Sequence, residues 1–314
     1  MNKISRLCLV GFFLLSGCGM AEKNSDSGDP EALKFKRPSK KPTVSYSTTF
    51  TGNDGMWAVD SLMSGGSVQF GVASPDASDQ KVALLTFPGD ASNNAADYVS
   101  PGYAEQIRTS KSLGYGHYRV VAKPSSCAAT SENVIYGLFT YWNNGSDLNQ
   151  NGMIDNSEID FEISCAEPGV IYMTVWTDYT DDTHFSKVTR RLDLTSGYYS
   201  ETSPGEEKNS WDLNGEGHLL DASGHVVALP DFTAMDEWLD LDMTWSVKSV
   251  KFGLTLQGIR YPLWTYANAS HIPSHAAPYM MNVWHSQYNW DSGALTDYPS
   301  QDQTLALDAF SYSP

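Results

Sequence analysis

Basic residues are scarce in this chain. Twenty Lys and Arg stand against 37 Asp and Glu in 314 residues, which gives a formal net charge of −17. Phosphate backbones would repel such a charge, so we expect no nucleic acid partner. The same charge disfavours heavily sulfated polymers and favours a neutral partner.

Several catalytic motifs are also missing. The sequence has no Gly-x-Ser-x-Gly elbow, no phosphate-cradling glycine loop and no Cys-x-x-Cys pair. His271 and His275 are four residues apart, but Pro273 between them disfavours a metal-binding helix. Apolar runs with helical period are scarce, and we expect one short helix at 232–241 in an otherwise all-β chain.

Three acids alternate with apolar residues at positions 158–162. On a β-strand Glu158, Asp160 and Glu162 share one face, where like charges disfavour each other's ionised forms. Glycosidic cleavage needs one carboxyl group protonated and one ionised. We therefore predict Glu158 as nucleophile, Asp160 as its orienting partner and Glu162 as general acid/base. The alternative is an acidic edge strand that resists pairing.

Aromatic strands flank these acids. Residues 134–142 and 170–176 are rich in β-branched and aromatic side chains. Tyr172, Thr174 and Trp176 share one face of the second segment. Aromatic rings beside carboxyl groups suit the apolar faces of sugar rings, although an aromatic-rich core remains the alternative for any single ring.

With these blocks the chain resembles glycoside hydrolase family 16, whose signature is a Glu-x-Asp-x-Glu strand in a β-jelly-roll. The resemblance spans roughly residues 46–314, and further matching blocks occur in the family's order at 104–109, 115–124, 137–141, 278–284 and 305–312. It implies an all-β, two-sheet, concanavalin A-like jelly-roll with a concave substrate cleft, and a retaining endo-acting hydrolase that uses Glu158, Asp160 and Glu162 in the roles above.

The family also indicates which residues contact substrate. By position it implies Arg108, Phe139, Tyr141, Thr174, Trp176, Asn282 and Trp284, to which the aromatic strands add Trp142 and Tyr172.

Some positions depart from the family. Gln106 stands where lichenase-type members often carry Glu, Gln257-Gly258 replaces an Asp-Gly turn, and residues 197–243 have no counterpart that we can place. The acid strand has no inserted residue, which resembles the lichenase and xyloglucan-active branch and favours internal cleavage of a neutral β-glucan containing 1,4 linkages. The substrate that we expect is a neutral β-glucan of the β-1,3-1,4 or β-1,3 type.

A loop directly before the acids follows the calcium-loop pattern. Its twelfth position is Glu158, which cannot be both a bidentate calcium ligand and an accessible nucleophile. The interpretation we prefer leaves Glu158 free and adds water or another residue to the shell. The alternative is an Asx-rich turn without metal. The expected ligands are Asp147, Asn149, Asn151, Met153 through its carbonyl oxygen, and Asp155.

The N-terminus resembles that of a bacterial lipoprotein. A basic start and an apolar stretch precede Leu15-Ser-Gly-Cys18. We expect a signal peptide at 1–17, a lipidated Cys18 with a flexible tether to residue 45, and one catalytic domain at 46–314. The protein would then be anchored to the outer membrane or cell surface by lipid alone, as a monomer. An ordinary secretory signal is the alternative.

Two cysteines remain for the domain once Cys8 leaves with the signal and Cys18 is lipidated. Export would place Cys127 and Cys165 in an oxidising compartment, and family order puts them near the ends of neighbouring strands. We expect a disulfide, with two free buried thiols as the alternative.

Several functions stay open beside hydrolysis of a polysaccharide without a catalytic cofactor. A transglycosylase would use the same site. A non-catalytic glycan-binding surface lipoprotein would not need both Glu158 and Glu162, so their joint presence disfavours it. In a third class, a calcium-stabilised adhesion module, Glu158 would be a metal ligand.

Overall fold

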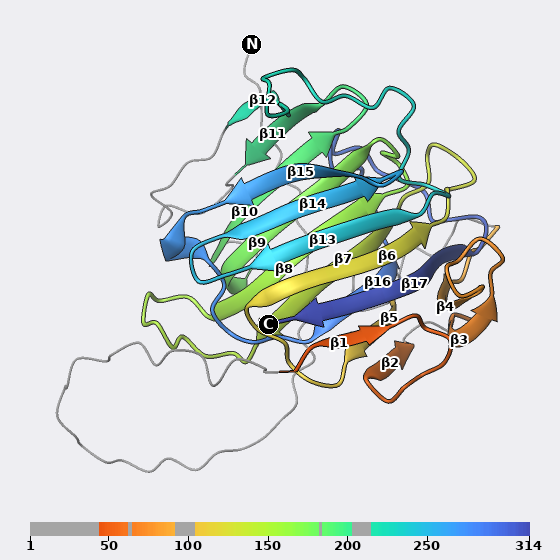
Figure 1. Ribbon diagram of the computed structural model, residues 1–314, viewed down its shortest axis with the longest axis horizontal. Coiled ribbons are helices and arrows are strands. Elements are labelled where there is room, and N and C mark those ends of the chain that lie inside the picture. Colours follow the sequence, from red (N-terminus) through yellow and green to blue (C-terminus); the bar gives the residue numbers. More distant parts are fainter. Residues whose placement is uncertain (1–43, 62–64, 92–103, 182–183, 203–214) are drawn as a thin grey trace.

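Two antiparallel sheets lie face to face and form a jelly-roll sandwich (Figure 1). The computed structural model describes residues 44–61, 65–91, 104–181, 184–202 and 215–314. The expected signal peptide, Cys18 and the tether up to residue 43 lie outside the described residues. The all-β prediction is confirmed.

Eight strands make the first sheet. In spatial order they are β15 (Ile259–Tyr266), β14 (Val250–Leu256), β13 (Leu239–Trp245), β6 (Gly116–Pro124), β17 (Gln303–Ser313), β4 (Lys81–Phe87) and β3 (Ser67–Ala73), with β1 (Tyr46–Thr48) paired to β17.

Nine strands make the second sheet, which carries the acids at its centre. Their order is β12 (Glu216–His218), β11 (Tyr198–Thr202), β10 (His184–Asp193), β9 (Val170–Asp181), β8 (Asp155–Ser164), β7 (Val134–Asn143), β16 (Tyr279–His285), β5 (Glu105–Thr109) and β2 (Trp57–Ser61).

The main core lies between the sheets. Ile159, Phe161 and Ile163 of β8 point into it, and the ring of Phe161 meets that of Phe252 on β14 at 5.1 Å between centroids. Side chains alternate along a strand, so the residues between these apolar ones face away from the core. We call this outer surface of the nine-stranded sheet, which carries Glu158, Asp160 and Glu162, the triad face.

A short helix expected at 232–241 does not form, and that prediction is wrong. The chain turns and enters β13 at Leu239, because Leu239, Leu241 and Met243 alternate into the core while β13 pairs with β6 and β14. Among the described residues the one helix is η1 (Ala269–His271). None of the helices in the described ranges is long and apolar enough to cross a membrane.

The stretch at 197–243 that resembles no part of the family extends the nine-stranded sheet. Its β11 pairs with β10, and β12 pairs with β11 at the sheet's edge. Residues 203–214 of this stretch lie outside the described ranges. The remainder leads through turns to β13.

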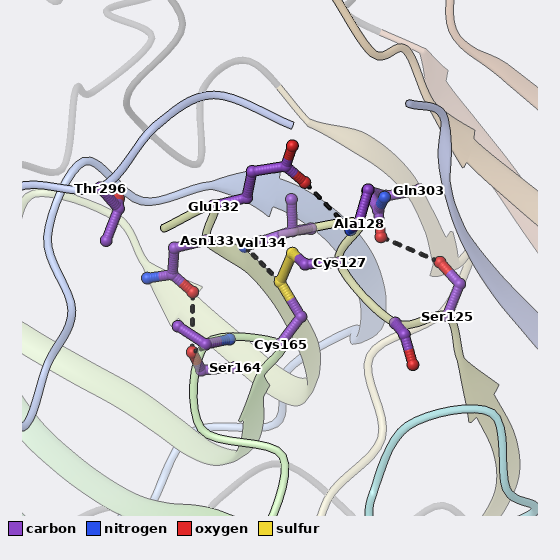
Figure 2. The surroundings of a disulfide bond; sticks show 12 residues. Ser125, Cys127, Ala128, Glu132, Asn133, Val134, Ser164, Cys165, Thr296 and Gln303 are labelled. Carbon is purple, nitrogen blue, oxygen red and sulfur yellow. Dashed lines mark hydrogen bonds between the residues drawn. A yellow bond between two sulfur atoms is a disulfide. The ribbon is translucent and has the colours of Figure 1, made fainter. Parts of the chain in front are cut away.

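A disulfide joins Cys127 and Cys165, with 5.5 Å between their Cα atoms (Figure 2). Cys165 directly follows β8, and its Sγ also accepts a hydrogen bond from the Val134 amide at 3.0 Å. Beside it, Ser164 Oγ donates to Asn133 Oδ1 at 2.7 Å. The disulfide therefore ties the end of the acid strand to the segment that leads into β7.

Candidate active site

The triad face is arranged in rows that run across the strands. In the first row Glu158 stands opposite Tyr141 of β7 and Trp176 of β9, and Trp176 stands opposite Lys187 of β10. Residues directly opposite each other in antiparallel strands have Cβ atoms about 4.5–5.5 Å apart. Pairing alone thus brings an aromatic ring to each side of Glu158.

The second row surrounds Asp160. Phe139 and Thr174 are its neighbours on β7 and β9. Beyond Phe139 the row continues through Met280 of β16 to Arg108 of β5. The structure therefore places Phe139, Thr174 and Arg108 on the triad face, where the sequence predicted them.

The third row contains Glu162. Gly137 and Tyr172 are its neighbours, and Asn282 lies next to Gly137. A Cβ atom on Gly137 would come within 2.4 Å of Asn282 Oδ1. Glycine at this position therefore leaves space for the Asn282 side chain beside Glu162.

Strand pairing is regular along the whole triad. Between Glu158 and Glu162, β8 keeps one register with β7 and one with β9. The irregularity in the β8–β9 pairing falls between Asp155 and Glu158, before the first acid. Because no bulge interrupts the acids, all three side chains leave the same face.

The three carboxyl groups differ in exposure. Glu158 is 5% exposed and Asp160 is 3% exposed, whereas Glu162 is half-buried. A group outside the protein can therefore approach Glu162 more readily than the two other acids. That difference suits the donation of a proton to a substrate oxygen.

Burial shifts the titration of all three acids upward. Desolvation raises the pKa of Glu158 to about 8, and the nearby charge of Glu162 adds to the shift. It raises the pKa of Glu162 to about 7. The pKa of Asp160 is raised well above its ordinary value, first by burial and then by the charges of Glu158 and Glu162. Because the three carboxyl groups interact, they titrate as one coupled set. Near neutral pH this set contains both protonated and ionised carboxyl groups.

Hydrogen bonds and nearby charges partly offset the effect of burial on these pKa values. Asn156 Nδ2 donates to Glu158 Oε2 at 2.8 Å and lowers the pKa of Glu158. A hydrogen bond from Trp176 lowers the pKa of Asp160, and the charge of Lys187 lowers the pKa of all three acids. Sequence reasoning missed Asn156 and Lys187. The two-residue spacing from Asn156 to Glu158 could have indicated the first.

Two arginines on the triad face are held in ion pairs. Arg108 Nε lies 2.8 Å from Asp60 Oδ2. Arg191, which stands opposite Tyr172, lies 2.9 Å from Glu167 Oε2 and 3.3 Å from Asp291 Oδ1.

The ion pair of Arg191 extends into a hydrogen-bond network. Tyr172 donates its hydroxyl to both oxygens of Glu167, at 2.9 and 3.0 Å. Tyr172 and Arg191 are therefore fixed in place at the end of the Glu162 row. Glu167 had no signal in the sequence pattern.

Aromatic rings cluster beside this network. Trp284 is buried and lies 6.0 Å from Trp290 between ring centroids, and Trp290 meets Tyr172 edge to face at 5.2 Å. Trp284 thus belongs to the triad face, as expected, but Trp290 packs against it. Trp290 was not predicted.

Trp142 is the predicted substrate residue that the structure moves elsewhere. It follows Tyr141 directly on β7 and pairs with Ser157, so it points away from the triad face. Its ring stacks on His275, with 3.9 Å between centroids. The aromatic content of the segment suggested a sugar contact, but strand alternation places Trp142 on the opposite side.

The loop at 147–155 is organised by its own side-chain oxygens. Asp147 accepts hydrogen bonds from the amides of Asn151 and Gly152, and Asn151 Oδ1 accepts one from the Met153 amide. Within the described ranges no three His, Cys, Asp or Glu side chains form a group that could hold a metal. A cation here would therefore need amide and carbonyl oxygens in addition to carboxylates, and calcium accepts all three kinds of ligand.

Asp155 and Asp178 add two buried carboxyl groups beside this loop. They face each other across β8 and β9 and are each 4% exposed. Asp178 Oδ1 accepts from Nδ2 of Asn151 at 3.0 Å. Asp155 Oδ2 accepts from the Leu148 amide at 3.2 Å, while Asp155 Oδ1 is buried without a hydrogen-bond partner.

Comparisons with known proteins show the fold. No protein-family model matches the chain, and no curated protein matches its sequence. Similar solved structures include the Crh5 transglycosylase in complex with NAG, with 15% identity, a TM-score of 0.50 and coverage of 88% of this chain and 86% of that one. At this identity the likeness establishes the two-sheet jelly-roll and nothing finer.

Two further solved structures are similar at lower TM-scores. The Bacillus licheniformis beta-glucanase is 17% identical, with a TM-score of 0.47 and coverage of 86% of this chain and 98% of that chain. A glycoside hydrolase family 16 endo-glucanase from Bacteroides ovatus is 11% identical, with a TM-score of 0.46 and coverage of 85% and 99%.

Proposed function

We propose that this protein is a retaining, endo-acting glycoside hydrolase whose substrate lies across the triad face. The observation that carries the proposal is the row geometry of Glu158, Asp160 and Glu162. Three carboxyl groups share one face of an unbroken strand, with raised pKa values and unequal exposure. Double displacement at a sugar needs one ionised and one protonated carboxyl group, and a set that holds protons near neutral pH can supply both.

Each acid has one role in this reaction. The Glu158 carboxylate attacks the anomeric carbon and forms a glycosyl ester, while Glu162 gives its proton to the leaving oxygen as the glycosidic bond breaks. Glu162 then takes a proton from water, which attacks the same carbon and releases Glu158. Two inversions leave the original configuration. Asp160 lies between the two glutamates and influences how protons are shared among the three carboxyl groups.

A neutral β-glucan of the β-1,3-1,4 or β-1,3 type is the substrate we propose. The uninterrupted register of the acid strand supports the assignment to the lichenase-like branch. The formal net charge of −17 supports a neutral polymer over a sulfated one. A transglycosylase would differ only in the acceptor, with a sugar hydroxyl in place of water.

The test is to incubate the purified protein with β-glucans and galactans and measure new reducing ends. We expect products from a β-glucan, and at least about a thousandfold lower rate in Glu158→Gln, because the nucleophile is then lost. Asp242→Asn, on the other sheet, is the matched control and should retain activity. Glycan binding without products in either protein would replace this proposal with the glycan-binding lipoprotein.

We also propose that the loop at 147–155 binds calcium. The unpartnered, buried Asp155 Oδ1 supports this, because its carboxyl group touches the loop backbone through the other oxygen. Asp147, Asn149, Asn151, the Met153 carbonyl and Asp155 would hold the ion, whose charge would offset the two facing carboxyl groups of Asp155 and Asp178.

Calcium-dependent melting tests that second proposal. We expect added calcium to raise the melting temperature of the chelator-treated protein, and Asp147→Ala to abolish the increase. Glu158→Gln should retain it, because Glu158 is not a ligand in this arrangement. Loss of the increase in Glu158→Gln would instead make Glu158 a ligand and contradict its role as nucleophile.

Finally, we propose that the protein is lipid-anchored in the cell envelope through Cys18. The proposal depends on the Leu15-Ser-Gly-Cys18 motif alone. Incorporation of labelled fatty acid into the wild type and its loss in Cys18→Ala would support it, and equal labelling of both would contradict it.

A further inference from the structure

Lys187 brings a positive charge to the nucleophile's row. It stands on β10 opposite Trp176, which in turn stands opposite Glu158. The Lys187 ammonium lies over the Trp176 ring at 4.5 Å from its centroid and at 5.8 Å from that of Phe185. An ammonium held against ring faces is attracted by their quadrupoles, so the two rings fix the position of this charge beside the acids.

Other charged or titratable groups also face the triad from the neighbouring strands. Tyr141 faces it from β7 and Tyr172 from β9, with Arg191 behind Tyr172 on β10. From β5, Arg108 faces it with its partner Asp60 of β2.

Both arginines are held by carboxylates that do not belong to the triad. Arg108 is ion-paired with Asp60, and Arg191 with Glu167 and Asp291. The positive charges of both arginines are thus offset by carboxylates outside the triad. Tyr141 stays neutral, since burial and the charge of Glu158 raise its pKa. The charge of Lys187 lowers the pKa of Glu158, of Asp160 and of Glu162.

We propose that Lys187 is a positioning residue of the proposed hydrolase: its ammonium group, held over Trp176, stabilises the ionised nucleophile Glu158. This inference rests on the proposed function. Burial alone would keep all three carboxyl groups protonated near neutral pH, and a protonated Glu158 cannot attack a sugar carbon. Lys187 acts through Glu158 and needs no contact with the substrate.

The same position explains why Lys187 suits Glu158. The two residues share one row, whereas Glu162 stands two rows away along β8. Coulomb attraction falls with distance, and the charge of Lys187 lowers the pKa of Glu158 from within the same row. It also lowers the pKa of Glu162, so removing it should make both glutamates harder to ionise.

Carboxyl titration tests the proposal without any assay of turnover. Proteins with ¹³C-labelled Glu and Asp side chains would be titrated by NMR as wild type, Lys187→Met and Lys187→Arg. Lysine has a long apolar stem that Met reproduces without the charge. We expect Lys187→Met to raise the pKa of Glu158 by about one unit, which is a tenfold loss of ionised nucleophile at a given pH, and Lys187→Arg to restore the wild-type value.

Turnover provides the second readout. The acidic limb of the kcat/KM profile should move upward by the same unit in Lys187→Met, with KM little changed. Lys251→Met is the matched control, because Lys251 is exposed on β14 of the other sheet and should leave both readouts unchanged. Should Lys187→Met fail to fold, Lys187→Gln provides the neutral variant.

Different failures remain distinguishable. An unchanged Glu158 titration in the neutral Lys187 variants would overturn the proposal, as would an equal shift in Lys251→Met, which would mean a general field effect. A wild type that hydrolyses no glycan but shows the Lys187-dependent titration would overturn the proposed function and leave the electrostatic link between Lys187 and Glu158 established.

Discussion

Two aspartates on the outer face of the eight-stranded sheet and the three acids of β8 on the nine-stranded sheet have different surroundings. On the eight-stranded sheet Asp240 and Asp242 are each paired with an arginine across the strands. Arg119 lies 2.7 Å from Asp240, and Arg260 lies 2.6 Å from Asp242. On the nine-stranded sheet Glu158 and Asp160 are more deeply buried than Asp240, and they share one face with a third acid.

The comparison distinguishes acids that stabilise the fold from acids that can exchange protons. A carboxylate that is paired with an arginine contributes to the fold through that ion pair. An acid that is buried among other acids is costly to ionise, and that cost keeps its proton exchange near neutral pH. The three acids that share one face of β8 thus mark the part of the nine-stranded sheet where we propose that the reaction takes place.

The largest expected effect comes from removing the covalent support of the acid strand. Replacing Cys127 and Cys165 by Ser opens a loop of 38 residues, which in a chain-entropy treatment lowers the free energy of unfolding by about 3–4 kcal/mol. Chemical denaturation of the double variant beside the wild type measures this. An unchanged midpoint would show that the disulfide does not hold the triad face.

A smaller effect follows from neutralising one acid on each face. The change in stability should have opposite signs for the two substitutions. Glu158 has its pKa raised to about 8, above the ordinary value of 4.5, so the unfolded chain releases this proton first as pH rises. The stability associated with Glu158 is complete below about pH 4.5 and falls as pH approaches 8. Glu158→Gln should therefore raise stability at pH 8, by an amount on the order of 2 kcal/mol, and change little at pH 4.

Asp242→Asn should lower the stability of the protein at neutral pH. It removes the charge that Arg260 contacts through two hydrogen bonds, so we expect a loss of about 1–2 kcal/mol. Thermal melting of Glu158→Gln and Asp242→Asn at pH 4, 6 and 8 checks both expectations. A melting temperature that falls in both variants at pH 8 would remove the distinction between the two faces.

The smallest effects sharpen the comparison through two glycines. A Cβ on Gly253 would come within 2.5 Å of Arg260 Nη2 and Asp242 Oδ1, and one on Gly137 within 2.4 Å of Asn282 Oδ1. Each substitution to Ala should cost about 1 kcal/mol of stability. Gly137→Ala should also lower kcat/KM, since Asn282 must move beside Glu162, whereas Gly253→Ala should not. Reducing-end assays and melting of the two variants decide this, and equal loss of activity in both would contradict it.

The acid face was predictable from the sequence because it depends on local alternation. Glu158, Asp160 and Glu162 need only a regular strand to share a face, and the apolar residues between them identify the core side. The same rule places Tyr172, Thr174 and Trp176 together. Applied to Tyr141 and its neighbour, it would also have excluded Trp142.

What the sequence could not show depends on pairing between strands. Lys187 meets Trp176 only through the β9–β10 register, which shifts twice between His184 and Lys187, and such irregularities have no local signature. Trp290 reaches the triad face from a loop. The strand at Leu239 was mistaken for a helix because a short apolar segment fits both periods, and pairing with β6 and β14 selected the strand.

The row arrangement has a consequence for how this surface can change over generations. A polymer that runs across the strands meets a new strand about every 4.8 Å, and each position it meets is an independent side chain on a hydrogen-bonded backbone. If the proposed glycan lies across the strands, mutations on β5, β10 or β16 can alter which sugar is accepted at one place while β8 keeps its three acids. In a sheet of this kind, substrate specificity can evolve without any change to the reaction.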